Sequence, residues 1–258
     1  MDRMLAVLLL LLPALSSAQG SYGRDLLQPK LVWKEQLLPL SSGTLDPSSS
    51  QVTRVAQTAV HYLNYNLGSP SFLRTLVHVR KASVKTIPGV GHKYSLQFST
   101  KHVQTGQNLG RCLATVFYLK EKPKPMIEAS CTDNKDAAQR RKDDYNLYIK
   151  IKDPLSAAEL ENVASIGSSY IAWEHSSEDV GYVMSEIKDM KKWESGNALE
   201  FDYTVLIDSD SDPSKTLSCH TRITWNLELP IKVKYDCTSE DTSGESADGS
   251  GEGDEYFY

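Results

Sequence analysis

The order of apolar and polar residues predicts a helix followed by four strands. From Gln51, apolar side chains recur on one face of a helix of about four turns. Runs that alternate between apolar and polar residues follow at 73–86, at 92–102 and twice within 109–131. A helix laid across such a sheet buries the apolar face of both, so the first half of the chain is predicted to form one α+β domain.

The second half of the chain repeats this order. Apolar residues from Leu160 to Ile171 share one helical face, and Gly167 within that face predicts a close approach between helix and sheet. A charged stretch of good helix formers, ended by Pro154, separates the two halves and predicts a linker helix. Four more alternating runs lie at 181–193, 199–208, 218–227 and 230–237.

The pattern therefore predicts an α+β fold of two tandem domains, each a helix packed on a four-stranded antiparallel sheet. The predicted divisions are a signal peptide (1–18), a tether (19–50), a first domain (51–131), a linker helix (132–154), a second domain (155–237) and an acidic tail (238–258).

The N-terminus carries the features of a secretory signal peptide. An apolar run from Met4 to Leu15, interrupted by Pro13, precedes the small residues Ser16, Ser17 and Ala18. This order predicts cleavage after Ala18 and a protein of the extracellular space or matrix. An uncleaved membrane anchor would need about 20 apolar residues. Because the run is shorter and no other segment could span a bilayer, no stable membrane span is predicted.

Four cysteines allow three disulfide pairings, and their spacing favours one of them. The pairs Cys112–Cys131 and Cys219–Cys237 would each enclose one predicted hairpin. Closing a loop of this length stabilises a fold by about 3 kcal/mol on the chain-entropy account. The absence of a CxxC spacing or a His/Cys cluster argues against a zinc site.

The net charge of −5 is concentrated in the tail, since residues 238–258 contain seven acids and no base. The rest of the chain is nearly neutral and shows no basic stripe with interleaved aromatic residues, so no nucleic-acid partner is predicted. Ser243 and Ser250 are phosphorylation candidates in S-x-E sequences, and Tyr256 and Tyr258, beside acids, are sulfation candidates. The simpler interpretation is a solubilising tail, and the two are compatible.

Five segments, in register along the chain, resemble one known family. They are 61–65 with 68–70, 87–94, 168–173, 201–206 and 232–235. On these segments the sequence is identified as a member of the latexin family, and its signal peptide, cysteines and acidic tail are more similar to secreted members than to latexin itself. The resemblance implies cystatin-like domains and inhibition of A-type zinc metallocarboxypeptidases by capping of the active-site cleft.

The resemblance also implies which loop meets the protease, namely the one between the second and third strands of the second domain. A solvated turn is the alternative interpretation of so polar a segment. The candidate contact residues are Asp208, Ser209, Asp210, Ser211, Asp212, Pro213, Ser214 and Lys215.

Catalysis has no support in the sequence. The six histidines are scattered, and neither an HExxH nor a GxSxG motif is present. The chain is therefore predicted to be no enzyme, with no catalytic residue, no cofactor and no metal site. Its expected partner is a zinc metallocarboxypeptidase. The alternative is an extracellular or eggshell matrix protein that engages Ca²⁺ or mineral through its acidic tail.

Overall fold

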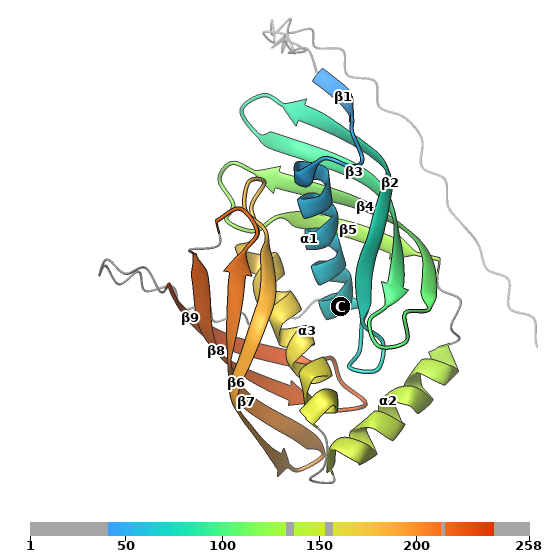
Figure 1. Cartoon of the computed structure of the whole chain (residues 1–258), viewed down its shortest axis with the longest axis vertical. Helices are drawn as coiled ribbons and strands as arrows, with labels where there is room; N and C mark the ends of the chain where they lie inside the picture. The colour runs from blue at the N-terminus through green and yellow to red at the C-terminus, as the bar shows by residue number, and fades with distance from the viewer. Residues whose placement is uncertain (1–40, 133–136, 153–156, 213–214, 240–258) are drawn as a thin grey trace, which may run out of the picture. The chain divides into compact units, whose positions relative to one another are not determined.

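The structure is a computed structural model that describes residues 41–132, 137–152, 157–212 and 215–239. These residues form two antiparallel sheets and three helices, an α+β fold as the sequence predicts (Figure 1). The predicted signal peptide and residues 240–258 of the tail lie outside the described residues. No helix in the described ranges has the length and apolar character needed to cross a membrane.

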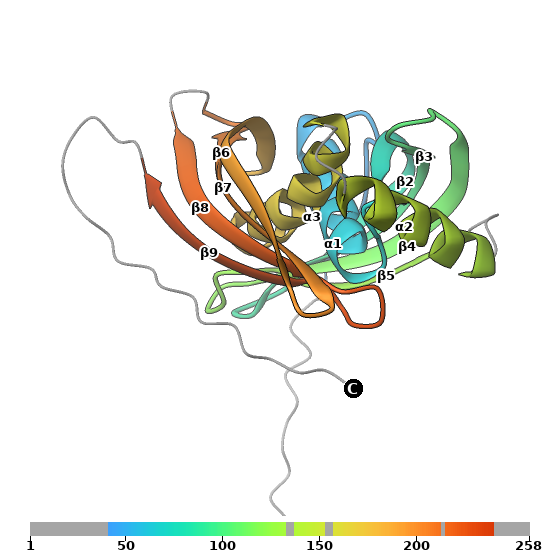
Figure 2. The same ribbon diagram turned by 90° about the horizontal axis from the view of Figure 1, so that it is seen from below.

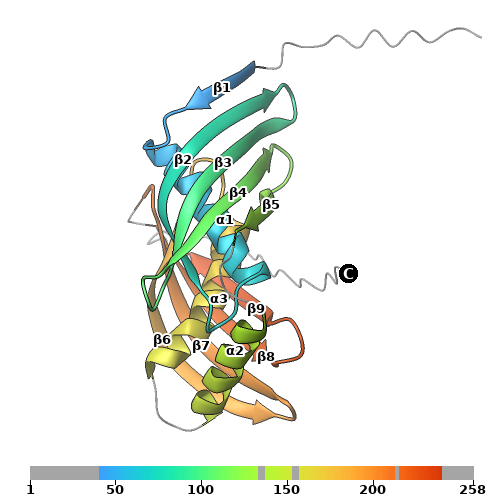
Figure 3. The ribbon, with the colours of Figure 1, turned by 90° about the vertical axis from the view of Figure 1, so that its right-hand side faces the viewer.

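The first module comprises residues 41–132, in which helix α1 packs on a five-stranded sheet. The strands follow one another across the sheet in chain order, from β1 to β5 (Figure 3). Their bounds are β1 Ser41–Leu45, α1 Ser50–Asn66, β2 Arg74–Ile87, β3 Gly91–His102, β4 Asn108–Leu119 and β5 Met126–Cys131.

The fifth strand of this sheet corrects the sequence prediction of four. β1 lies within the predicted tether and pairs antiparallel with β2, from Ser41 opposite Thr86 to Leu45 opposite Ala82. Its sequence SSGTL has no apolar alternation, because only Leu45 packs against the core and the other described side chains are largely exposed. Backbone pairing at a sheet edge leaves no hydrophobic pattern to detect.

Helix α1 begins and packs as its sequence indicates. Ser49 is the N-cap, and its hydroxyl accepts a hydrogen bond from the backbone N–H of Val52 at 3.3 Å. The apolar face of the helix is fully buried against the inner side of the sheet. That core includes Val52, Val55, Ala56, Ala59 and Leu63 from the helix, and Tyr94, Leu96, Phe98, Ala114 and Val116 from the strands.

The second module, residues 157–239, combines helix α3 with a four-stranded sheet in the order β6-β7-β8-β9. Gly167 of α3 confirms the predicted close approach: a Cβ there would lie 2.3 Å from the Tyr203 hydroxyl and 2.9 Å from Ile223 Cδ1. The element bounds are α3 Ala157–His175, β6 Tyr182–Ser195, β7 Ala198–Ser209, β8 Thr216–Trp225 and β9 Lys232–Ser239.

Helix α2, Ala137–Lys152, lies in the stretch where the sequence predicts a linker helix. Leu147, Tyr148 and Ile151 join the core of the second module. The Tyr148 ring meets Trp225 edge to face, with 5.2 Å between centroids. The helix is thus packed on the second sheet by its apolar side.

One disulfide crosses the last strand pair of each module. Cys112 and Cys131 face each other across β4 and β5, and Cys219 and Cys237 do so across β8 and β9. These are the two pairs that the sequence spacing favours. Each bond therefore joins neighbouring strands of a single sheet.

The two modules meet through their helices. α1 and α3 run side by side between the two sheets (Figure 2). Residues of α1 and of the first sheet contact α3 and the start of the second sheet through the polar and aromatic clusters described below. This interface positions the candidate functional loop.

Candidate functional site

The loop that joins β7 to β8 holds one shape through its own hydrogen bonds. The Ser209 hydroxyl accepts from the backbone N–H groups of Ser211 and Asp212, at 3.3 and 3.2 Å. The backbone N–H of Ser209 donates to the Lys215 carbonyl at 3.0 Å. Thr216 closes the base of the loop by donating its hydroxyl to Asp208 Oδ1 at 2.8 Å. Most polar groups at the base of the loop are therefore satisfied internally.

Asp210 ties this loop to the first module. Its carboxylate accepts both contacts from Arg54 Nε of α1, at 3.1 and 2.9 Å, and a third from the Gly181 backbone N–H at 2.7 Å. The Asp210 backbone N–H in turn donates to the Gly181 carbonyl at 2.9 Å. A side chain at position 181 would collide with this arrangement, since a Cβ there would lie 2.8 Å from Asp210 Oδ2.

This geometry changes what the loop can offer a partner. The charge of Asp210 is paired with Arg54, whereas Asp208 accepts a hydrogen bond from the neutral hydroxyl of Thr216 and keeps its charge. Ser211 and Lys215 are exposed at the described end of the loop, whereas Pro213 and Ser214 lie outside the described residues. The loop thus presents a fixed shape, in which the carboxylate of Asp210 is already paired within the chain.

A second polar cluster surrounds Glu178, just after α3. One carboxylate oxygen lies 2.6 Å from His92 Nδ1, and the other accepts from the Tyr94 hydroxyl. Gln51 of α1 donates to the same tyrosine oxygen at 3.0 Å. Burial, together with the hydrogen bond to Glu178, raises the pKa of Tyr94 well above its ordinary value. The hydroxyl therefore stays protonated and acts as a donor.

A third cluster centres on Glu174 of α3. Lys124 of the first module lies 3.0 Å from one carboxylate oxygen, and the Tyr235 hydroxyl donates to the other at 2.7 Å. Burial raises the pKa of Tyr235 strongly, and the nearby Glu174 adds to the effect. Trp173 joins the same contact, because its indole N–H donates to the Pro125 carbonyl at 3.2 Å.

Aromatic packing fills the space between these polar clusters. Tyr62 of α1 meets Trp173 edge to face, with ring centroids 5.1 Å apart. Tyr65 stacks at 4.3 Å on Tyr170, which in turn contacts Tyr235. Such aromatic pairs contribute about 0.5–1.5 kcal/mol each beyond their buried area. The two modules are therefore joined by apolar as well as charged contacts.

Among the described residues, the contacts to carboxylates across this interface all have the same polarity. The cation or hydrogen-bond donor comes from the first module, and the carboxylate comes from the second. Residues 41–132 carry eleven Lys and Arg against three Asp and Glu, a formal charge of +8, whereas residues 157–239 carry seven against fifteen, a formal charge of −8. The sequence prediction of a nearly neutral body is correct for the total charge, but it does not show that the two modules carry opposite charges.

His61 lies in the same interface without a strong partner. Neither ring nitrogen has a hydrogen-bond partner within the described residues, and both are buried. Burial lowers the pKa of His61 to about 4, although the nearby Tyr182 backbone offsets part of the effect. The imidazole is therefore neutral at pH 7 and acts as packing. The chain pattern marks His61 only as part of a family segment.

No group of three or more His, Cys, Asp or Glu side chains that could hold a metal ion occurs in the described ranges. The arrangement around the β7–β8 loop is a set of satisfied contacts between modules. Because these contacts form within the chain itself, the loop is ordered without any partner. The sequence could not identify these partners, since Arg54 and Asp210 are separated by 156 residues.

Fold and site together define a class: α+β proteins in which two helix-on-sheet modules meet helix to helix and each closes with a disulfide-linked strand pair. This chain belongs to the latexin family, whose profile matches residues 45–161 and 154–243. The family assignment from the five sequence segments is confirmed.

Three relatives illustrate the similarity. Ovocalyxin-32 of Gallus gallus is 33% identical over 242 residues, 86% of each chain. Retinoic acid receptor responder protein 1 of Homo sapiens is 31% identical over 225 residues, 78% of this chain and 76% of the relative. Latexin of Homo sapiens is 25% identical over 210 residues, 74% of this chain and 94% of the relative. The first two relatives, ovocalyxin and the retinoid-responsive protein, are the two members that the sequence features favour over latexin itself.

Among solved structures, mouse fetuin-B in complex with crayfish astacin aligns with 77% of this chain and 73% of that one. The TM-score is 0.31 and the sequence identity is 16%, so the similarity is distant.

Proposed function

We propose that this protein is a secreted inhibitor of A-type zinc metallocarboxypeptidases, built from two cystatin-like modules, that caps the enzyme's active-site cleft. Membership in the latexin family carries this proposal, because it spans both modules. On this proposal the chain binds an enzyme and performs no catalysis itself. The contact loop is the one between β7 and β8, residues 208–215.

The anchoring of the loop supports this assignment. A loop that is already ordered loses little conformational freedom on entering a cleft, so more of the contact energy appears as affinity. Arg54, Asp210 and Gly181 supply that order by fixing the loop against α1 and the start of the second sheet. A specific complex of this kind buries about 1,600 Å² in total, so neighbouring surfaces of both modules must contribute as well.

The test is a titration of carboxypeptidase A with the purified chain, using a peptide substrate that ends in an aromatic residue. Turnover should fall as a saturable function of inhibitor concentration. Replacement of Ser211 and Lys215 by Gly should raise the inhibition constant about tenfold or more, while Leu227→Gly and Glu228→Gly in the β8–β9 turn serve as the control. Undiminished turnover at saturating inhibitor, across several A-type enzymes, would overturn the proposal.

A second function is favoured by a separate observation, the acidity of the tail. Residues 238–258 contain seven acids and no base, and one relative is named ovocalyxin-32. Clustered carboxylates are ligands that Ca²⁺ prefers. We therefore propose, as the alternative, association with a mineral or extracellular matrix through the tail.

A single truncated variant distinguishes these two proposed functions. A chain that ends at Ser239 should lose adsorption to calcium carbonate while it retains carboxypeptidase inhibition. Equal adsorption of the full and shortened chains would remove the basis for the tail proposal and leave the inhibitor proposal intact.

A further inference from the structure

The first module carries more positive charge than its ion pairs with the second module compensate. Of its eleven Lys and Arg residues, Arg54 and Lys124 pair with carboxylates of the second module. Arg74 is buried and donates to the Thr100 hydroxyl at 3.3 Å. The remaining cations lie on the surface, and six of them gather on one side of the first sheet.

These six residues define a basic face on the outer side of β2, β3 and β4. The core residues Ala82, Tyr94 and Cys112 point towards α1, so alternation places Lys81, Lys85, Lys93, Lys101 and Arg111 on the opposite side. Arg80 lies at a bulge in β2, and its Nε donates at 3.1 Å to the hydroxyl of Ser99, which alternates with the core residue Phe98. All six are exposed, and none forms an ion pair within the described part of the chain. The basic face consists of Arg80, Lys81, Lys85, Lys93, Lys101 and Arg111.

Two of these cations face each other directly. Lys85 of β2 is opposite Lys93 of β3 in the strand register. Like charges at such positions disfavour the sheet, so folding alone does not account for the pair. Glu128, on β5, is the one carboxylate that the described strands place on this outer side, and it lies away from both lysines. A bound polyanion would relieve the repulsion.

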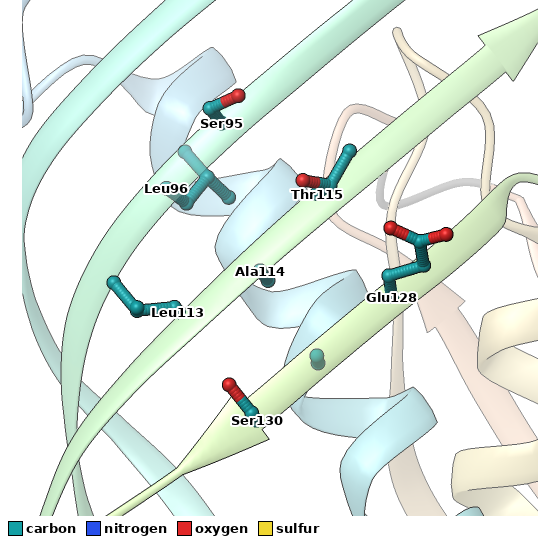
Figure 4. Close-up of a pocket in the computed structure, with 8 residues that line it drawn as sticks. Ser95, Leu96, Leu113, Ala114, Thr115, Glu128 and Ser130 are labelled. Carbon is teal, nitrogen blue, oxygen red and sulfur yellow. The ribbon is translucent and has the colours of Figure 1, made fainter.

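A row of hydroxyl groups crosses the sheet beside the lysine pair. The register aligns Thr44, Ser83, Ser95 and Thr115 on β1 to β4. Ser95 and Thr115 line an open pocket of about 380 Å³ together with Leu113, Glu128 and Ser130. Figure 4 shows these side chains on the near side of the strands, with α1 behind the sheet. Neighbouring strands bring the hydroxyls about 4.8 Å apart, a spacing suited to a chain of polar groups.

We propose that the basic face binds a linear sulfated polysaccharide. The cations are distributed along the strands, with Lys81 and Lys85 about 13 Å apart at 3.3 Å per residue. Such a spread matches repeated negative charges along a polymer better than a single sulfate. The hydroxyl row supplies hydrogen-bond donors and acceptors to sugar hydroxyls and sulfate oxygens between the charges.

The surface chemistry favours a sugar polymer over nucleic acid. Single-stranded nucleic acid is bound by stacking on exposed aromatic rings. Among the described residues of the basic face no exposed Trp, Tyr or Phe is present, since Tyr94 and Tyr118 point inward and Phe117 is half-buried. The basic face offers hydroxyl groups and cations but no exposed aromatic ring, which suits a sulfated sugar polymer better than a nucleic acid.

The experiment measures binding of the full chain to immobilised heparin, a sulfated polysaccharide, across a series of salt concentrations. The variant Lys81→Gln/Lys85→Gln/Lys93→Gln should bind about tenfold or more weakly, with a shallower dependence of log affinity on log salt, because fewer counterions are released. The matched control is Lys191→Gln/Lys232→Gln/Lys234→Gln on the second sheet, which removes the same charge and should change affinity less than twofold. Circular dichroism confirms that both variants are folded.

Three outcomes would overturn the proposal. Equal weakening by the two triple variants would make the effect one of net charge. Equal affinity for single-stranded DNA of matched charge, with the same loss in the first variant, would make the face a nucleic-acid site. The third concerns a full-length chain whose seven tail acids are replaced by amides. If it binds heparin about tenfold more tightly, and a peptide of residues 240–258 displaces the heparin, the tail itself is the occupant.

Discussion

Gly167 decides how closely α3 can pack on the second sheet. The Tyr203 hydroxyl occupies the space that a side chain would need, and it donates to the Ala164 carbonyl at 3.2 Å. Burial raises the pKa of Tyr203 far above its ordinary value, so this donor stays protonated. A larger residue at position 167 must therefore displace either the ring or the helix.

Gly167→Ala should lower the free energy of unfolding by about 1–3 kcal/mol, the usual cost of overpacking. Helix propensity alone predicts the opposite sign, a gain of about 1 kcal/mol for alanine. Urea denaturation with the disulfides intact measures the difference. Adding Tyr203→Phe should recover part of the loss, since the hydroxyl is the nearest clashing group. A stabilised Gly167→Ala variant would contradict the packing account.

His61 makes stability depend on pH. Its pKa falls from 6.5 to about 4 on folding, so the unfolded chain binds the extra proton first. The stability contributed by keeping this imidazole neutral is complete above pH 6.5 and is lost as the pH falls towards 4. The full loss amounts to about 3–4 kcal/mol, at 1.36 kcal/mol for each unit of pKa difference.

The matching measurement is chemical denaturation between pH 7 and pH 4. His61→Phe should flatten the slope of unfolding free energy against pH, while His78→Phe, at an exposed position, should leave the slope as it is. Burial also lowers the pKa of His175, so some slope remains in the first variant. Identical slopes in the two variants would exclude His61 as the source.

At the scale of elements, the sequence predicts well whatever leaves an apolar period. α1, α3 and the eight longer strands show that period because each has one face on a core. β1 is missed by the sequence prediction, because its residues SSGTL are held by backbone pairing along a sheet edge and show no apolar period. The family resemblance predicts that the β7–β8 loop is a contact loop. Its anchoring by Arg54 depends on a tertiary contact that no local pattern encodes.

Each disulfide joins one pair of neighbouring strands, and its contribution to stability can be measured by removing it. Cys219→Ala with Cys237→Ala should lower the free energy of unfolding by about 3 kcal/mol, and Cys112→Ala with Cys131→Ala should do nearly the same, because the closed loops differ by one residue. Guanidinium titrations of the two double variants provide the comparison. A loss below about 1 kcal/mol would show that the hydrogen-bonded ladders alone hold these strands.

For the whole molecule, the opposite charges of the two modules predict a coupled interface. Arg54 and Asp210 are partly exposed, so their interaction should be worth only about 1 kcal/mol. A double-mutant cycle with Arg54→Gln and Asp210→Asn isolates that energy. It should shrink further in 1 M salt, since exposed charges are screened. Strict additivity of the two substitutions would mean that this contact contributes nothing to stability.

The placement of the bridges also governs how the fold would respond to being pulled. Force applied to the C-terminal end of β9 would separate it from β8 only as far as Cys237. There the disulfide to Cys219 would prevent further separation of the strands. Cys219 and Cys237 are separated by 18 positions, and the loop between them would bear no force while the bond is intact. The extension released on rupture would therefore be shorter by roughly 60 Å, the length of that loop as an extended chain. A reducing agent would restore that missing length in a single-molecule trace.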